Sequence, residues 1–138
     1  MIILDTNVLS ALMTPQAHQP VVRWLDEQRA ESIWTSVISL YEIRAGIHLL
    51  PEGRRKRGLN SSLDDLLARQ FQSRLAWYDQ EAAEHAARIG TAQVRSGLNV
   101  ELQDIMIAGI VVARDAKLAT RNVKHFAGIA ERLVNPWD

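Results

Sequence analysis

The sequence contains no cysteine, which excludes disulfide bonds, thiol catalysis and thiolate metal sites. It also lacks any apolar stretch near the ~18 residues that a membrane-spanning helix needs. Sixteen basic and sixteen acidic residues cancel, so net charge gives no overall attraction to nucleic acid or membrane, although a local patch can still bind nucleic acid. The apolar start is only four residues long, which does not resemble a signal peptide. We therefore expect a cytoplasmic protein with no membrane partner.

What is present indicates one globular domain, residues 1–138, with ordinary hydrophobic content. Short apolar runs alternate with segments whose apolar residues recur at helical spacing. This alternation predicts an α/β fold in which a mainly parallel sheet has helices on both faces. Strands are expected at 1–4, 32–35, 75–77, 117–120 and 133–134. Helices are expected at 8–13, 20–29, 37–50, 59–71, 80–95 and 102–113, with Asp79 as an N-cap.

The first seven residues place an acid at the expected ligand-binding edge of the predicted sheet. Met1 to Leu4 form an apolar run, and Asp5-Thr6-Asn7 follows at once. Asp5 is therefore expected just past the carboxyl end of a strand, where open α/β sheets bind ligands. A carboxylate is costly to bury alone, so it needs a cation, a hydrogen-bond donor or water. The alternative for Asp5 is a turn or capping role.

Two further acids lie in helices where an acid is unusual. Glu42 is surrounded along its helix by small or apolar residues, including Ala45 and Gly46, which would let a neighbouring element approach and the carboxylate point inward. Asp104 stands in the first turn of the most apolar helix of the chain, where the helix dipole favours a carboxylate. Taken singly, Glu42 could equally face solvent and Asp104 could be an N-cap. Together with Asp5 they could form an oxygen-only site, which suits Mg²⁺ or Mn²⁺ and not zinc.

Four segments resemble, in order and spacing, the motifs of PIN-domain ribonucleases, and the likeness covers essentially the whole chain. They are Asp5-Thr6-Asn7, Tyr41 to Gly46, Gln103 to Ala108, and Leu118 to Asn122. The length and the final Asn135-Pro136-Trp137 resemble the VapC toxins, especially their FitB-like branch. The resemblance implies a PIN-like three-layer α/β/α sandwich and a Mg²⁺- or Mn²⁺-dependent endoribonuclease. It also implies the toxin of a type II toxin–antitoxin pair: a homodimer that assembles with a VapB- or FitA-like antitoxin.

The same resemblance assigns roles to individual residues. Family catalytic acids correspond to Asp5, Glu42 and Asp104, with Asp5 and Asp104 holding the metal. Asn7 and Thr120 match polar residues that support the acids. Many relatives carry a fourth acid after the fourth strand, where this chain has Asn122 and His125, so a second metal site is in doubt. Asn122 could supply a carbonyl ligand, and His125 is expected to be a surface or capping residue, with phosphate contact as the alternative.

The only dense charge run offers two interpretations. Arg54, Arg55, Lys56 and Arg57 could bind RNA phosphates, or they could form a solvated loop. Two other functional classes also remain open. An Asp after the first strand could accept a phosphoryl group, as in HAD-like phosphatases, although these enzymes need a second Asp where Asn7 stands. A PIN-fold RNA- or protein-binding module with impaired catalysis is the other alternative, motivated by the missing fourth acid.

Overall fold

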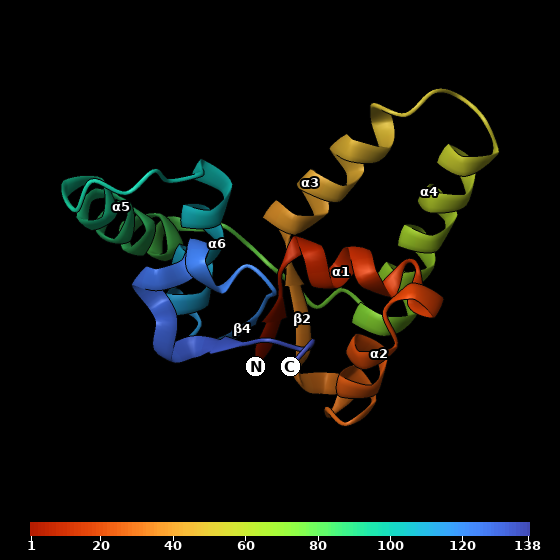
Figure 1. Ribbon diagram of the computed structural model, residues 1–138, viewed down its shortest axis with the longest axis horizontal. Coiled ribbons are helices and arrows are strands. Elements are labelled where there is room, and N and C mark those ends of the chain that lie inside the picture. Colours follow the sequence, from red (N-terminus) through yellow and green to blue (C-terminus); the bar gives the residue numbers. More distant parts are fainter.

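A parallel sheet runs through the middle of the molecule (Figure 1), as described by a computed structural model of residues 1–138. The strands lie in the order β3-β2-β1-β4-β5, and every neighbouring pair is parallel. Their bounds are β1 Ile2–Leu4, β2 Ile33–Ser36, β3 Leu75–Ala76, β4 Lys117–Ala119 and β5 Leu133–Val134. Each agrees with the predicted strand to within one or two residues. Because β1 is central, the residue that follows it is flanked by strands on both sides.

Helices cover both faces of this sheet, as predicted (Figure 1). The α-helices are α1 Thr6–Leu12, α2 Gln19–Asp26, α3 Val37–His48, α4 Arg54–Leu66, α5 Gln80–Arg95 and α6 Leu102–Ala113. Shorter helical segments are η1 Pro15–Ala17, η2 Ala30–Ser32, η3 Leu67–Phe71 and η4 Val123–Arg132, of which η3 is a π-helical turn. None of the helices combines the length and the apolar composition needed to cross a membrane.

Two hydrophobic cores, one on each face of the sheet, make this a three-layer fold. Along β1, Ile3 belongs to the core beneath α5, α6 and η4, whereas Leu4 belongs to the core shared with α1, α2 and α4. Along β4, Leu118 and Ala119 divide in the same way. This alternation follows from the two-residue repeat of a strand. All four side chains are fully buried, as expected for strands covered on both faces.

Helix α6 is the central helix that its apolar sequence predicts. Ile107, Ile110 and Val111 are fully buried, and α6 packs tightly against α5. The two backbones meet at Gly109, where a Cβ atom would lie only 2.3 Å from the carbonyl oxygen of Ala82. Asp79 caps α5 by accepting a 2.9 Å hydrogen bond from the backbone N–H of Ala82, as predicted. This packing fixes the first turn of α6, which carries Asp104.

The basic run is helical and not a loop, because α4 already begins at Arg54, although Arg54, Arg55 and Arg57 are exposed to solvent as that interpretation expects. Arginine and lysine are good helix formers, and they extend the helix toward the N-terminus from the predicted start at Leu59. Their side chains do not need burial, since Leu59 and Leu63 supply the packing of this helix. The sequence pattern indicated the apolar half of the helix and missed its solvent-facing first turns.

Candidate active site

Asp5 lies where two neighbouring parallel strands end together. Leu4 at the end of β1 pairs with Ala119 at the end of β4, so Asp5 and Thr120 leave the sheet side by side. The backbone N–H of Asp5 donates to the carbonyl of Ala119 at 2.9 Å, which continues the ladder by one residue. Asp5 is 4% exposed and Thr120 is fully buried. The sequence argument that put an acid at this edge is therefore correct in position.

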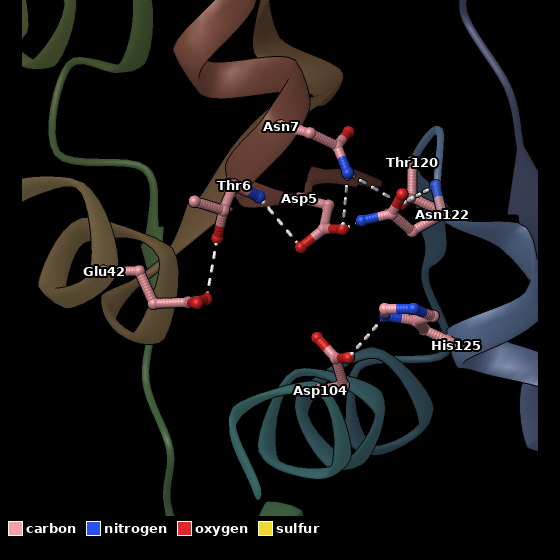
Figure 2. A network of polar contacts seen from close by, with 8 residues as sticks. All are labelled: Asp5, Thr6, Asn7, Glu42, Asp104, Thr120, Asn122 and His125. Atoms are coloured by element: carbon pink, nitrogen blue, oxygen red, sulfur yellow. Dashed lines mark hydrogen bonds and ion pairs between the residues drawn. The ribbon is translucent and has the colours of Figure 1, made fainter. Parts of the chain in front are cut away.

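The Asp5 carboxylate is held by donors on both of its oxygens (Figure 2). Oδ1 accepts from the backbone N–H of Thr6 at 2.8 Å, which also caps α1. Oδ2 accepts from the Thr120 hydroxyl at 2.7 Å and from the Asn7 amide at 3.2 Å. Asn7 in turn accepts from the backbone N–H of Arg121 at 3.1 Å through its Oδ1. Asn7 and Thr120 thus fix the carboxylate, and Oδ1 of Asp5 keeps a lone pair for another partner.

Glu42 reaches the same region from the second turn of α3. Its Oε1 accepts from the Thr6 hydroxyl at 2.8 Å, and the Thr6 and Ser39 hydroxyl oxygens lie 3.1 Å apart. Because a hydroxyl has one proton and a carboxylate only accepts, Thr6 donates to Glu42, and its oxygen can accept a hydrogen bond from the Ser39 hydroxyl. Thr6 and Ser39 are site residues that the sequence reasoning missed. The available signals were the position of Thr6 beside Asp5 and the position of Ser39 three residues before Glu42 on the same helix.

Glu42 points inward as expected, but the small residues beside it are not the cause. Gly46 is exposed, and a Cβ atom there would meet nothing within 4 Å, so no element approaches α3 at that position. Glu42 is half-buried because of the neighbouring α1, whose Thr6 supplies the hydrogen bond. The helix contact that matters is therefore between α3 and α1.

Asp104 completes the group from the opposite side, on the first turn of α6 (Figure 2). It is not the N-cap, because Glu101 occupies that position and no side chain caps this helix. The Asp104 Oδ2 atom instead lies 3.0 Å from Nδ1 of His125 on η4. The side chain of His125 is 54% exposed, yet its ring is directed at the acid. His125 is a surface residue, as expected, but the prediction missed its contact with Asp104.

The surroundings of Asp5 and Asp104 raise the pKa values of both carboxyl groups. Burial raises the pKa of Asp5 above its ordinary value, opposed by the Thr120 and Thr6 hydrogen bonds and reinforced by the charge of Asp104. Burial also raises the pKa of Asp104, opposed by His125 and reinforced by the charge of Glu42. The charge of Asp104 thus acts on Asp5 and the charge of Glu42 acts on Asp104, as expected of carboxylates around one space.

This donor set fits a hard divalent cation. Figure 2 shows Asp5, Glu42 and Asp104 projecting from three elements toward a common space. No three acidic or histidine side chains converge closely enough to enclose an ion, so the site is more open than a preformed three-ligand centre. Oxygen donors without cysteine suit Mg²⁺ or Mn²⁺. A cation would offset both the burial and the weaker charge repulsion that raise the pKa values of Asp5 and Asp104.

Asn122 and the C-terminal segment border the Asp5 side of the site. Asn122 is exposed, and its backbone N–H donates to the Thr120 hydroxyl at 3.0 Å. The Thr120 N–H donates to the carbonyl of Val134 at 2.9 Å, and the Arg121 guanidinium lies 4.8 Å from the Trp137 ring centre. The last residues of the chain thus support the loop that positions Thr120.

The basic run is not part of the acid group. Figure 1 shows the start of α4 at the outer end of the α3–α4 pair, away from the ends of β1 and β4. Arg54, Arg55 and Arg57 are exposed there. Lys56 is occupied, because its ammonium binds Glu52 at 2.6 Å and the carbonyl of His48 at 3.2 Å. Only the three arginines are therefore free for a further partner.

Comparison with known proteins gives consistent matches over the full length. The toxin FitB of Neisseria gonorrhoeae is 32% identical over 137 residues, covering 99% of both chains. The VapC ribonuclease Y4jK of Sinorhizobium fredii is 30% identical over 138 residues, covering 100% of this chain and 99% of the relative. The crystal structure of FitAcB from Neisseria gonorrhoeae superposes with a TM-score of 0.88 at 33% identity, covering 99% of both chains. The PIN domain model matches residues 2–131, and the chain therefore belongs to the PIN domain family.

Proposed function

We propose that this protein is a Mg²⁺- or Mn²⁺-dependent endoribonuclease that acts as the toxin of a type II toxin–antitoxin system. One observation carries the nuclease part: Asp5, Glu42 and Asp104 face a common space at the carboxyl edge of the sheet (Figure 2). Asp5 and Asp104 are the proposed metal ligands, on opposite sides of that space. A bound divalent cation would supply positive charge and Lewis acidity at the scissile phosphate.

The chain itself positions the reacting groups. Thr120, Asn7 and the N–H of Thr6 keep the Asp5 carboxylate in one orientation, so little reorganisation is needed when a cation binds. Glu42 is the proposed proton acceptor or third acidic partner, oriented by the hydroxyl of Thr6. His125 orients Asp104 from η4. Asn122 is a weaker candidate, as a carbonyl ligand at the exposed rim.

Two alternatives are distinguished by particular residues. In the HAD-like phosphatase interpretation, a second acid two residues after Asp5 is required. Here the Asn7 amide donates to Asp5 and to Thr120, which is a positioning role. The binding-module interpretation draws on Asn122 and His125, which stand where a fourth acid is expected. A nuclease remains favoured because the three remaining acids are held in place.

The toxin assignment draws on the relatives' names, toxin FitB and VapC ribonuclease, and on the FitAcB complex. By analogy we propose an RNA substrate in the cytoplasm, a homodimer, and a VapB- or FitA-like antitoxin that assembles around it. The acid group is a suitable receptor for an antitoxin arginine, because a guanidinium can bind a carboxylate through two hydrogen bonds. Such an arginine would compete directly with the cation.

The decisive experiment is cleavage of total RNA by purified protein, with Mn²⁺, with Mg²⁺ and with chelator. We expect metal-dependent cleavage by the wild type and none by folded Asp104→Asn. The control is Asp26→Asn, which changes an exposed acid on α2. Cleavage by Asp104→Asn at the wild-type rate would remove Asp104 from the catalytic group. Binding of RNA without cleavage by the wild type would favour the binding module, and hydrolysis of a small phosphate ester would favour the phosphatase.

A further inference from the structure

A pocket with a volume of about 240 Å³ opens directly beside Asp104 and His125. It lies between the end of α5, the loop that leads into α6, and the start of η4. Leu98 and Ile105 contribute apolar surface, Asn99 an amide, Glu101 a carboxylate and Lys124 an ammonium. Since Asp104 and His125 line it as well, a ligand bound here would be continuous with the acid group.

Two of the charged groups that line this pocket, Glu101 and Lys124, have no charged partner within the protein. Glu101 occupies the N-cap position of α6, but its side chain makes no capping hydrogen bond. Neither Glu101 nor Lys124 takes part in any of the ion pairs of the protein. The Glu101 charge acts on Asp104, which places this carboxylate near the acid group. An acceptor at the start of α6 and a donor of opposite charge on η4 are therefore free in the lining of a small pocket.

We propose that this pocket binds one unpaired guanine base, next to the phosphate that is cleaved. The inference rests on the proposed ribonuclease function. The Watson–Crick edge of guanine carries two adjacent N–H donors, which match the two oxygens of Glu101, and an O6 acceptor, which matches Lys124. Adenine, cytosine and uracil each present one donor group beside ring or carbonyl acceptors, so a carboxylate is poorly matched to them.

The size and position of the pocket agree with a single base. Its volume is below the range of about 300–1,000 Å³ that is typical of sites for drug-sized ligands. Proteins read RNA sequence mostly on unpaired bases, which are stacked on rings and hydrogen-bonded at their edges. The imidazole of His125 offers such a ring, and the side chain of Leu98 adds apolar surface. The phosphate of the same nucleotide would then extend toward Asp104.

Binding can be measured without catalysis. Titration of the metal-free protein with guanosine 5′-monophosphate, followed by NMR, should shift the amide signals of Glu101 and Lys124. Adenosine, cytidine and uridine monophosphates should bind more weakly. Glu101→Gln should weaken guanosine monophosphate binding by about tenfold, the effect of removing one bidentate interaction with a base. The matched control is Glu84→Gln, an exposed acid on α5 outside the pocket, which should bind like the wild type.

Mapping of cleavage sites supplies the second readout. Wild-type protein should cut a random-sequence RNA pool with guanine enriched at one position beside the cut. That enrichment should fall in Glu101→Gln. In a defined RNA, replacement of this guanosine by inosine, which lacks the 2-amino group, should slow cleavage by the wild type. Equal binding of all four monophosphates, or an enrichment unchanged in Glu101→Gln, would overturn the inference. Guanosine monophosphate binding without any RNA cleavage would instead overturn the ribonuclease proposal and leave the base pocket standing.

Discussion

The Nδ1 atom of His125 lies 3.0 Å from Oδ2 of Asp104, which joins η4 to the first turn of α6. The carboxylate is the more buried partner, with side-chain exposures of 20% for Asp104 and 54% for His125. The histidine therefore stands between solvent and an acid that burial alone would tend to protonate. Its hydrogen bond and charge both lower the pKa of Asp104 and so favour the form that can bind a cation.

Replacement of His125 by alanine should make cation binding more sensitive to pH. Without His125, the pKa of Asp104 rises further, because burial and the charge of Glu42 remain. A protonated carboxylate is a poor ligand, so Mn²⁺ affinity should fall as the pH falls, and more steeply in the variant. Calorimetric titration with Mn²⁺ at about pH 5 and about pH 8 would measure this. A ratio of the two proteins' affinities that stays the same at both pH values would show that His125 does not tune Asp104.

Asp5→Asn should change how stability depends on pH and on metal. Burial raises the folded-state pKa of Asp5, so its contribution to folding is present below the unfolded pKa and is lost as pH rises through the folded pKa. The metal-free wild type should therefore lose stability with rising pH in that window, and the variant should lose less. Metal at a hundredfold excess over its Kd should stabilise the wild type by about 2.7 kcal/mol and the variant much less.

Denaturant unfolding of both proteins across this pH window, with and without Mn²⁺, would measure both effects. Glu27→Gln at the end of α2 is a suitable control, because it removes one exposed acid that is not part of the acid group. Equal metal stabilisation of Asp5→Asn and the wild type would place the cation away from Asp5.

Two glycines in helices should respond to alanine in opposite directions. At Gly109 the added Cβ would lie 2.3 Å from the Ala82 carbonyl oxygen and 2.8 Å from the Ala86 Cβ, so α5 and α6 must separate. Overpacking of this kind costs about 1–3 kcal/mol. At Gly46 nothing lies within 4 Å, so alanine should stabilise α3 by about 0.5–1 kcal/mol. Denaturant unfolding midpoints of the two variants would test this, and destabilisation by Gly46→Ala would contradict the open space at that position.

The sequence predicts those features that depend on local patterns. The apolar run before Asp5, the N-cap at Asp79 and the apolar surface of α6 each depend on a few neighbouring residues, and the structure agrees with all three. The strand-end position of Asp5 follows from the same local pattern. This position alone indicates that the site lies at the carboxyl edge of the sheet.

The remaining features arise from contacts between distant segments. The Thr6–Glu42 and Asp104–His125 hydrogen bonds join residues 36 and 21 positions apart, so no periodicity within one element reveals them. The turn after η3 is another such case, because Gln72 and Ser73 adopt left-handed backbone angles with φ of 47° and 70° without a glycine to announce them. The pocket beside Asp104 likewise requires three elements to meet.

Replacement of Arg54, Arg55 and Arg57 by alanine should weaken RNA binding and flatten its dependence on salt. The three guanidinium groups are exposed at the start of α4, where the helix dipole disfavours positive charge by about 0.3–1 kcal/mol each. The helix dipole therefore does not account for their presence at this end of α4. For every phosphate that an arginine no longer neutralises, the slope of log affinity against log salt should fall by about 0.7 on single-stranded RNA.

A control with the same change in net charge separates a local interaction from a general electrostatic effect. Arg23, Arg29 and Arg69 are exposed on other segments and can be replaced by alanine together. Binding of a catalytically inactive Asp104→Asn background to single-stranded RNA would be measured across a series of salt concentrations. A smaller slope for the α4 triple variant alone would place RNA along the start of α4. Equal slopes for both triple variants would mean that only net charge matters, and an unchanged slope would leave the arginines of α4 with no role in RNA binding.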